Sequence, residues 1–427
     1  MNYYLAIDIG ASSGRHIIGW KGDNSQIETK EIYRFPNSMT DFNNHLTWDI
    51  NSLFFHVKKG IDIAIENFHN IISLSVDTWG VDYVLINAEQ EILPCYAYRD
   101  LRTQKSIPEV HKIIPFEELY KKTGIQFQTF NTIYQLYADK LDGRLENVTD
   151  FLLMPEYLLY KLCGVKSHEY TEATTGGMVN AYTEQYDSEI INALELPEHL
   201  FCKLDKPGKI IGKYKNINCV LCPSHDTASA IEAIPMKGNE IYISSGTWSL
   251  LGVKSKEPIT SHESFLSNFT NEGGVNYICY LKNIMGMWLV NRLRDELCPG
   301  KNFSEIITEA ENSNFNYTVD ATDEIFLSPI SMKEAFDSKL TQPVKNISDY
   351  FRCAYRSLAT TYAKAVENIE RNTKQKYSVI YIVGGGAKNN FLNRLTEQAT
   401  NKKIIALPIE ATALGNLKIQ MQTGGDL

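Results

Sequence analysis

Hydrophobic residues near the N-terminus follow two different periods. Residues 3–9, 16–20 and 27–35 are rich in apolar and aromatic side chains and are separated by short polar segments, which predicts three strands. From Asp49 onward, apolar residues such as Leu53, Val57 and Ile61 recur every three or four positions, which predicts an amphipathic helix with Asp49 as its N-cap. Residues 71–76 and 81–86 are again typical of strands. This order predicts an α/β unit with a mixed sheet.

The second half of the chain repeats the same pattern. Residues 240–252 form two apolar runs around a turn of Ser, Gly and Thr, as residues 7–19 do near the N-terminus. Residues 350–369 have a helical period, and a predicted strand at 379–383 precedes three consecutive glycines. Two copies of one unit predict two α/β lobes, residues 1–234 and 235–427, with mixed sheets and a ligand cleft between them.

Composition narrows the class of function. The net charge of −9 argues against a nucleic-acid or anionic-membrane partner, because both need clustered Lys and Arg. Asp8 interrupts the first apolar run, which disfavours a secretory signal, and no run of about 18 apolar residues occurs, which disfavours a membrane-spanning helix. We therefore expect a cytoplasmic protein. We also expect a monomer or a homodimer. The eight cysteines then fit reduced core residues. Cys219 and Cys222 have redox or metal spacing, but the apolar run around them favours a buried strand.

Two turns of small residues are candidate phosphate sites. The first follows Asp8 and comprises Ala11, Ser12, Ser13, Gly14 and Arg15; the second spans residues 244–247. Backbone N–H groups in such turns can bind phosphate oxygens, and the serine hydroxyls add donors. Asp8 at a strand end can hold Mg²⁺ through water, and Arg15 can offset developing charge. One Gly-Ser turn is usually only a hairpin, so the presence of the second turn favours a triphosphate site.

A candidate general base lies at a predicted strand-to-helix junction. Residues 223–230 read Pro-Ser-His-Asp-Thr-Ala-Ser-Ala, which places His225 beside Asp226 before a run of small residues. Phosphoryl transfer to a hydroxyl needs a carboxylate that orients the nucleophile and accepts its proton. Asp226 fits that role, and it equally fits a helix N-cap.

The three glycines at 384–386 join a predicted strand to a predicted helix. Without side chains they let a flat group such as adenine or ribose approach the backbone. A plain helix-entry loop is the alternative. A dinucleotide fold is disfavoured because the spacing is not GxGxxG and lies far from the first strand.

Together these motifs resemble those of the FGGY carbohydrate kinases of the actin-like ATPase superfamily. Asp8 with its turn resembles the first phosphate motif, Ser245-Gly246-Thr247 the second, and Gly384-Gly385-Gly386 the adenosine motif. The resemblance implies two actin-like, ribonuclease H-like lobes, with ATP and Mg²⁺ as cofactors and a small sugar as acceptor.

The resemblance also implies roles for individual residues. It implies Asp226 as the catalytic base and Asp8 at the metal. The nucleotide contacts it implies are Ala11, Ser12, Ser13, Gly14, Arg15, Thr247, Asn291, Gly385 and Gly386. The sugar contacts are Gly80, Asp82, His225, Asp226, Thr227 and Asn283. Asn291 stands where relatives often carry Gln. Trp79 and Tyr83 fit core aromatics equally well, and Asn283 fits a helix cap.

Within the family, longer motifs are similar to the members that phosphorylate L-rhamnulose to L-rhamnulose 1-phosphate in L-rhamnose catabolism. These motifs lie at 77–83, 97–103, 124–132, 224–227, 244–248, 282–286 and 410–416. Another ketose such as L-fuculose or L-xylulose remains an alternative acceptor. An actin-like ATPase with a protein partner is a different class, which leaves residues 79–80 and 98–103 unexplained. A nicotinamide dehydrogenase would need an early dinucleotide fingerprint, and the sequence has none.

Overall fold

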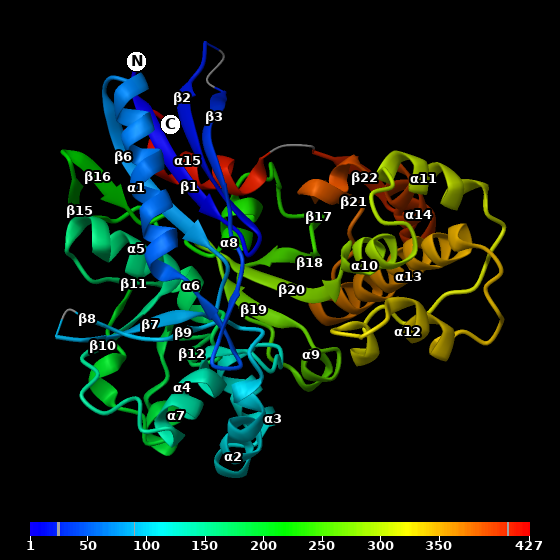
Figure 1. The fold of residues 1–427 in the computed structure, drawn as a ribbon, viewed down its shortest axis with the longest axis horizontal. Coiled ribbons are helices and arrows are strands. Elements are labelled where there is room, and N and C mark those ends of the chain that lie inside the picture. The colour runs from blue at the N-terminus through cyan, green and yellow to red at the C-terminus, as the bar shows by residue number, and fades with distance from the viewer. Residues whose placement is uncertain (24–25, 89, 408–409) are drawn as a thin grey trace. The chain divides into compact units, whose positions relative to one another are not determined.

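A computed structural model describes residues 1–23, 26–88, 90–407 and 410–427. The chain forms two compact units (Figure 1). Unit 1 comprises Met1–Ala233, Ser255–Tyr280 and Glu410–Leu427, and unit 2 comprises Ile234–Lys254 and Leu281–Ile409. The sequence predicts a division at 234/235 with contiguous lobes; in the structure two later segments return to unit 1.

A mixed sheet forms the centre of unit 1. Its order is β15-β16-β6-β1-β2-β3, with β1 antiparallel to β2 and parallel to β6. The strands are β1 (Tyr3–Ile9), β2 (Ser13–Lys21), β3 (Ile27–Pro36), β6 (Ile71–Thr78), β15 (Ile210–Tyr214) and β16 (Ile217–Val220). The predicted strands and the turn after Asp8 are therefore confirmed, as is the buried strand at Cys219.

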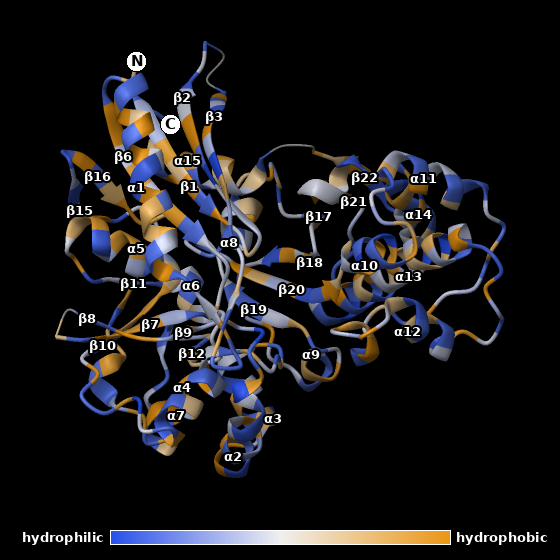
Figure 2. Cartoon of the chain, viewed as in Figure 1, coloured by the Kyte–Doolittle hydropathy of each residue, from blue (hydrophilic) through white to orange (hydrophobic). Residues whose placement is uncertain are grey.

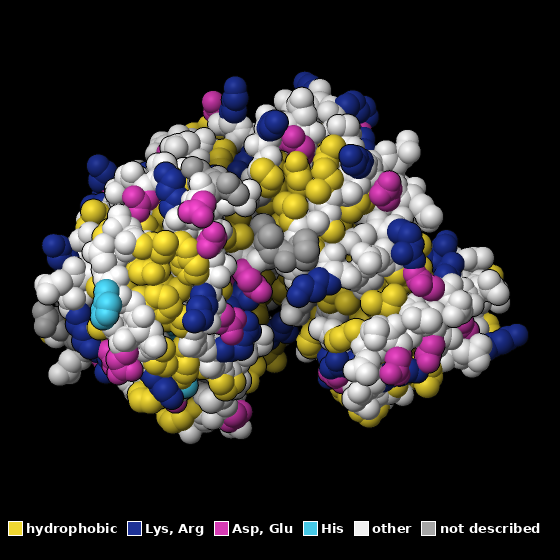
Figure 3. All heavy atoms as spheres, turned by 90° about the horizontal axis from the view of Figure 1, so that it is seen from above, with side chains coloured by type: hydrophobic (Ala, Val, Ile, Leu, Met, Phe, Trp, Pro, Cys, Tyr) yellow, Lys and Arg dark blue, Asp and Glu magenta, His cyan; other side chains and the backbone are white. Residues whose placement is uncertain are grey.

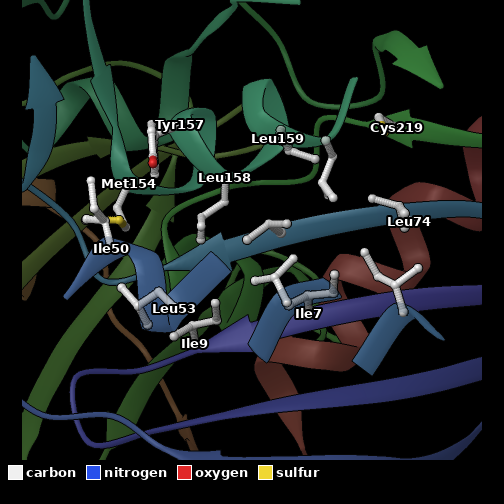
Figure 4. Packing of buried hydrophobic residues seen from close by; sticks show 14 of the residues in the cluster. Ile7, Ile9, Ile50, Leu53, Leu74, Met154, Tyr157, Leu158, Leu159 and Cys219 are labelled. Atoms are coloured by element: carbon white, nitrogen blue, oxygen red, sulfur yellow. The ribbon is translucent and has the colours of Figure 1, made fainter. Parts of the chain in front are cut away.

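One face of this sheet packs against α1 (Ile50–Asn67) and α5 (Met154–Cys163). The predicted N-cap is confirmed, because the Asp49 carboxylate accepts a hydrogen bond of 2.9 Å from the Ser52 N–H. Hydrophobic and hydrophilic residues alternate along α1 (Figure 2), and its buried positions include Leu53, Val57 and Ile61. Figure 4 shows Leu53 of α1 with Ile7 and Leu74 of the sheet and Leu158 of α5 in one apolar core.

The other face packs against α15 (Ala411–Gly424), which lies beside α8 (Asp226–Glu232). Ala413, Leu417 and Met421 of α15 form a cluster with Tyr4, Ala6 and Ile17 of the sheet. The two helices approach closely at Gly415, where a Cβ atom would lie 1.8 Å from the Ser229 carbonyl oxygen. This apolar face explains why residues 410–427 belong to unit 1 rather than to a contiguous second lobe.

Shorter elements complete unit 1, most of them in a region where the sequence pattern predicts little. The small sheets combine β4 (Thr40–Phe42), β5 (His45–Trp48) and β9 (Cys95–Tyr96); β7 (Tyr83–Asn87), β8 (Gln90–Ile92) and β10 (Asp150–Leu153); β11 (His168–Glu169) and β14 (Leu204–Asp205); and β12 (Val179–Asn180) and β13 (Gln185–Tyr186). The remaining elements are η1 (Leu101–Lys105), α2 (Ser106–Ile113), α3 (Phe116–Thr123), α4 (Thr132–Leu141), α6 (Tyr170–Thr174), α7 (Ser188–Ala193), η2 (Glu198–Leu200), α9 (His262–Leu266) and β19 (Thr270–Gly273).

Unit 2 repeats the central pattern of unit 1. Strand β17 (Glu240–Ser245) is antiparallel to β18 (Trp248–Ser255) and parallel to β21 (Val379–Val383), as β1 is to β2 and β6. The strands of this sheet that lie at least partly in unit 2 are, in order, β20 (Ile278–Met285), β18, β17, β21 and β22 (Lys403–Ala406). The other elements are α10 (Trp288–Leu297), α11 (Phe303–Asn312), η3 (Glu324–Phe326), α12 (Met332–Lys339), α13 (Ile347–Thr373), η4 (Gly385–Lys388) and α14 (Asn390–Thr400). The predicted helix at 350–369 and strand at 379–383 are confirmed.

The surface and the cysteines agree with an ordinary globular protein. On the face drawn in Figure 3, side chains of both charges are interspersed. The eight cysteines are free thiols, and Cys219 and Cys222 are both buried. Within the described ranges, no helix has the length and apolar character needed to cross a membrane.

Candidate active site

Two carboxylates stand at the ends of neighbouring parallel strands in unit 1. Asp8 near the end of β1 is the register partner of Asp77 near the end of β6. Asp8 pairs with Arg15 from β2, whose Nε atom donates a 2.9 Å hydrogen bond to Asp8 Oδ2. The same guanidinium also pairs with Glu410, the residue that precedes α15. Arg15 therefore links the first phosphate turn to the start of the last helix.

Asp77 is a candidate site residue that the sequence analysis did not single out. Its side chain is fully buried, and Oδ2 accepts a 2.5 Å hydrogen bond from Asn416 Nδ2 of α15. Asn416 is held in turn by Gln420, whose Nε2 donates to Asn416 Oδ1 at 2.7 Å. Oδ1 of Asp77 has no hydrogen-bond partner among the described residues. The sequence signal that could have identified Asp77 is an acidic residue at the end of a predicted strand, the position that Asp8 occupies in β1.

The candidate base lies at the junction between β16 and α8. Asp226 is the first residue of α8, and its side chain is 31% exposed, so it remains accessible to a ligand. The Thr227 hydroxyl donates to Asp226 Oδ1 at 3.1 Å, and His225 Nε2 lies 3.6 Å from the same oxygen. His225 occupies the N-cap position of α8 without a capping hydrogen bond. The alternative interpretation of Asp226 as an N-cap is therefore wrong.

Gly80 and Asp82 flank a strained residue. Val81 has φ of 71°, a left-handed conformation that is rare for a β-branched residue and occurs where the surroundings enforce it. Thr175 Oγ1 accepts from the Val81 N–H at 3.2 Å, and the Thr132 hydroxyl donates to the Val81 carbonyl at 2.8 Å. These contacts fix the turn that presents Gly80.

Asp82 is completely buried beneath this turn. Its carboxylate accepts hydrogen bonds from Trp48 Nε1 at 2.6 Å, Trp79 Nε1 at 3.0 Å, the Tyr98 N–H at 3.0 Å and Gln135 Nε2 at 3.0 Å. The structure thus gives no support to the expected direct contact between Asp82 and a sugar, and it makes Asp82 the anchor of the surrounding aromatics. Trp79 and Tyr83 are buried in the core, as the alternative interpretation had it.

Unit 2 brings together the second turn and the glycine loop. Thr247 is exposed in the turn between β17 and β18, and its carbonyl accepts from the N–H groups of Gly286 and Trp288. Gly384 has φ of 82°, and a Cβ atom there would lie 2.7 Å from the Ser245 carbonyl oxygen. A Cβ atom at Gly386 would lie 2.0 Å from Ser245 Oγ, whereas one at Gly385 would meet open space. The loop therefore needs glycine to pack against the turn.

Two further predicted residues also lie in unit 2. Asn291 is half-buried in α10, and Asn283 is half-buried within β20. Because Asn283 lies inside a strand, its interpretation as a helix cap is wrong. Among the predicted sugar contacts, Gly80, Asp82, His225, Asp226 and Thr227 belong to unit 1.

Burial is the largest influence on the pKa values of the unit 1 carboxylates. Burial raises the pKa of Asp8, Asp77 and Asp226, most strongly for Asp77. Each of Asp8 and Asp77 also feels the charge of Asp226, which raises its pKa further. Arg15 lowers the pKa of Asp8, and His225 lowers that of Asp226. The three carboxylates therefore repel one another, and a bound cation would reduce this repulsion.

The donor set fits a magnesium ion bound together with phosphate. Asp77 Oδ1 is a buried, orphaned carboxylate oxygen, and Asp8 lies beside it on the neighbouring strand. Within the described residues, no group of three or more His, Cys, Asp or Glu side chains could hold a metal ion. Mg²⁺ usually binds through one or two carboxylates plus water and substrate phosphates, and Asp8 and Asp77 are two such carboxylates.

Comparison with known protein families decides the identity of this arrangement. Residues 3–222 match the N-terminal domain of the FGGY family of carbohydrate kinases, and residues 241–423 match its C-terminal domain. The chain belongs to the FGGY family of carbohydrate kinases. The resemblance seen in the sequence motifs is thereby confirmed, and this FGGY kinase is an enzyme that transfers a phosphoryl group to a sugar.

Individual relatives are similar over nearly the whole chain. Rhamnulokinase of Oceanobacillus iheyensis is 40% identical, covering 98% of this chain and 92% of that protein. Rhamnulokinase of Halalkalibacterium halodurans is 39% identical, covering 100% and 95%. Among solved structures, xylulose kinase from Lactobacillus acidophilus has a TM-score of 0.84 at 15% identity, covering 100% of this FGGY kinase and 90% of that chain. Gluconate kinase from the same organism has a TM-score of 0.83 at 15% identity, covering 99% and 89%. The structural likeness confirms the two-lobed α/β fold.

Proposed function

We propose that this FGGY kinase transfers the γ-phosphoryl group of ATP to the 1-hydroxyl of L-rhamnulose, giving L-rhamnulose 1-phosphate and ADP. The observation that carries the proposal is the similarity to rhamnulokinases, 37–40% identical over nearly the full chain. The site supports the same reaction type, because an accessible carboxylate, two small-residue turns and a glycine loop are the parts that phosphoryl transfer requires.

Asp226 is the proposed general base. Its side chain is accessible while the neighbouring His225 and Thr227 are buried, so these neighbours fix the direction of the carboxylate. The carboxylate accepts the proton of the attacking sugar hydroxyl as the O–P bond forms, and ADP leaves with the electron pair of the broken P–O bond. We propose that His225, Thr227, Gly80 and Asn283 bind the remaining sugar hydroxyls.

The proposed nucleotide contacts are the turn from Ala11 to Arg15 in unit 1, and Thr247, Asn291, Gly385 and Gly386 in unit 2. Backbone N–H groups and hydroxyls of the turns would orient the phosphates, and the open side of Gly385 would admit the adenosine. Asp8, with Asp77 Oδ1 beside it, would hold Mg²⁺. When bound, Mg²⁺ neutralises charge on the β- and γ-phosphate oxygens.

The proposal is tested by ATP consumption over a panel of acceptors: L-rhamnulose, L-fuculose, L-xylulose, D-xylulose, L-ribulose and glycerol. We expect kcat/KM to be highest for L-rhamnulose at saturating Mg-ATP, with slower reaction of ketoses that differ at one hydroxyl. Chelation with EDTA should abolish turnover, and added Mg²⁺ should restore it. A higher kcat/KM for another acceptor contradicts the assigned substrate, and ADP formation independent of any acceptor contradicts a sugar kinase.

A further inference from the structure

Glu272 of β19 faces the catalytic junction from a part of the chain that no motif marks. We propose that Glu272 is a positioning residue that holds the imidazole of His225. The imidazole in turn orients the carboxylate of Asp226 and sets the charge beside it. This inference rests on the proposed function of Asp226 as the base. It assigns to Glu272 an effect on catalysis that passes through His225 rather than through contact with substrate.

The distances place the His225 ring between two carboxylates. His225 Nδ1 lies 3.4 Å from Glu272 Oε2, and His225 Nε2 lies 3.6 Å from Asp226 Oδ1. Both side chains of the Glu272–His225 pair are buried. Neither Nδ1 nor Oε2 has a hydrogen-bond partner among the described residues, so each is available to the other. Their separation of 3.4 Å is only slightly longer than an ordinary N–H···O hydrogen bond.

The backbone on both sides of this pair is held firmly. In β19, Asn271 Nδ2 donates to the Gly124 carbonyl at 3.0 Å, and the Gly273 N–H donates to Thr174 Oγ1 at 2.8 Å. His225 forms a parallel bridge with Thr78, and the Ser224 carbonyl accepts from the Thr78 N–H at 2.9 Å. The remaining freedom is the orientation of the imidazole, which is what a carboxylate at Nδ1 would fix.

Charge supports the same role. Burial lowers the pKa of His225, but the nearby charge of Glu272, with the charges of Asp226 and Glu169, raises it overall above its usual value. Carboxylates therefore face His225 from β19, α8 and β11. Interaction with the charged form of His225 lowers the pKa of Asp226, against the upward effects of burial and of Glu272 itself. An imidazolium donates from both nitrogens, whereas a neutral ring with Nδ1–H toward Glu272 would present a lone pair to Asp226.

A double-mutant cycle tests the proposal. Glu272→Gln, His225→Gln and the double variant are compared by kcat and KM for the sugar at saturating Mg-ATP. We expect Glu272→Gln to lower kcat by roughly tenfold to a hundredfold, as for the loss of a positioning contact. We expect less than a twofold further effect when it is added to His225→Gln, because the residue it acts through is already gone. Glu272→Asp should recover part of the loss. A full multiplicative loss in the double variant overturns the proposal, as does wild-type kcat in Glu272→Gln.

Two controls separate positioning from stability and from the choice of sugar. Asn271→Ala removes contacts of the same strand that do not involve His225. Its effect on kcat should therefore multiply with that of His225→Gln. Titration of His225 by NMR of the histidine ring gives a readout that needs no activity. The pKa of His225 should fall in Glu272→Gln, and an unchanged pKa overturns the proposal. The cycle uses whichever ketose the panel selects, so a wrong substrate would not obscure the result.

Discussion

Asp226 combines accessibility with fixed neighbours, so its replacement should isolate the proton-accepting step. Asp226→Asn preserves the shape and the hydrogen bond from Thr227, but the amide cannot accept the proton of the sugar hydroxyl. We expect kcat to fall about 10²–10⁴-fold, with nucleotide and sugar affinity nearly unchanged. Steady-state kinetics and calorimetric binding measure the two quantities. Turnover within a few-fold of the wild type would falsify the assignment of the base.

His16 provides a pH-dependent test of stability away from the site. Its imidazole is fully buried, with Nε2 donating to the Val57 carbonyl at 3.1 Å. Burial lowers the pKa of His16 from 6.5 to about 4. The unfolded chain therefore binds a proton between pH 6.5 and 4 that the folded chain does not. This contribution is fully present above pH 6.5 and is lost as pH falls toward 4.

We expect the unfolding free energy to decline over that window by roughly 3 kcal/mol from His16 alone. Urea unfolding of the wild type and of His16→Gln at matched pH values measures the difference. The variant should lose this part of the slope while other titrating groups contribute equally to both proteins. Parallel curves for the two proteins would show that His16 is not the group responsible.

At this scale, the residues found from sequence were those that stand inside local motifs. Asp8, His225 and Asp226 lie next to turns or junctions whose small residues have a local signature. Asp77 and Glu410 begin the motifs at 77–83 and 410–416, but their partners lie in segments that are distant in sequence, so the motifs do not reveal their roles. Glu272 lies in no motif and gains its place through its contact with His225. The burial of Asp82 behind two tryptophans was also invisible to the pattern, since an acidic residue in a motif gives no sign of its depth.

Among the elements, α8 and α15 depend on one glycine for their contact. A Cβ atom at Gly415 would lie 1.8 Å from the Ser229 carbonyl oxygen and 3.3 Å from the Ala233 nitrogen, and backbone atoms cannot turn aside. Gly415→Ala should therefore lower the unfolding free energy by about 1–3 kcal/mol from overpacking, even though Ala favours a helix by about 1 kcal/mol. Gln422→Ala on the exposed side of α15 is the matched control. Equal midpoints for the two variants in urea unfolding would contradict close packing at this position.

Elements were predictable where they have one polar face or form a short, continuous apolar run. The helices α1 and α13 alternate between core and solvent, so their periods are visible. Strands such as β1 and β6 are buried over most of their length and are visible as apolar runs instead. In α4, residues Thr132 to Asp139 are all buried, and α5 begins with six buried residues. A helix that is covered on all sides loses the polar stripe that reveals it. Very short elements such as β11 and α6 leave no period at all.

For the whole molecule, the two units make a testable statement about cooperativity. Leu417 lies in the last helix but is buried in the core of unit 1, whereas Ile380 of β21 is buried in unit 2. Leu417→Ala and Leu74→Ala should each lower the midpoint temperature of the same calorimetric transition, because each lowers the unfolding free energy of unit 1 by about 2–5 kcal/mol. Ile380→Ala should lower the midpoint temperature of a different transition. If Leu417→Ala shifted the transition that Ile380→Ala shifts, the assignment of the last helix to unit 1 would be wrong.

The division of the chain was the least predictable feature at this scale. The repeat of strand, turn and strand located, near Ala233, the point where the chain first passes from unit 1 to unit 2. No periodicity, however, indicates which sheet a later helix covers. That choice depends on the match between Ala413, Leu417 and Met421 and the residues of β1 and β2 that they cover.

The return of α15 to unit 1 also has a consequence for synthesis on the ribosome. Domains generally fold as units in the order in which they emerge. Here the apolar face formed by Tyr4, Ala6 and Ile17 emerges first, and residues 410–427, which cover it, emerge only after every residue of unit 2. During elongation the nascent chain therefore carries an uncovered hydrophobic face, which is the kind of surface that a ribosome-associated chaperone protects. The first sheet to be translated is the last to have both of its faces covered.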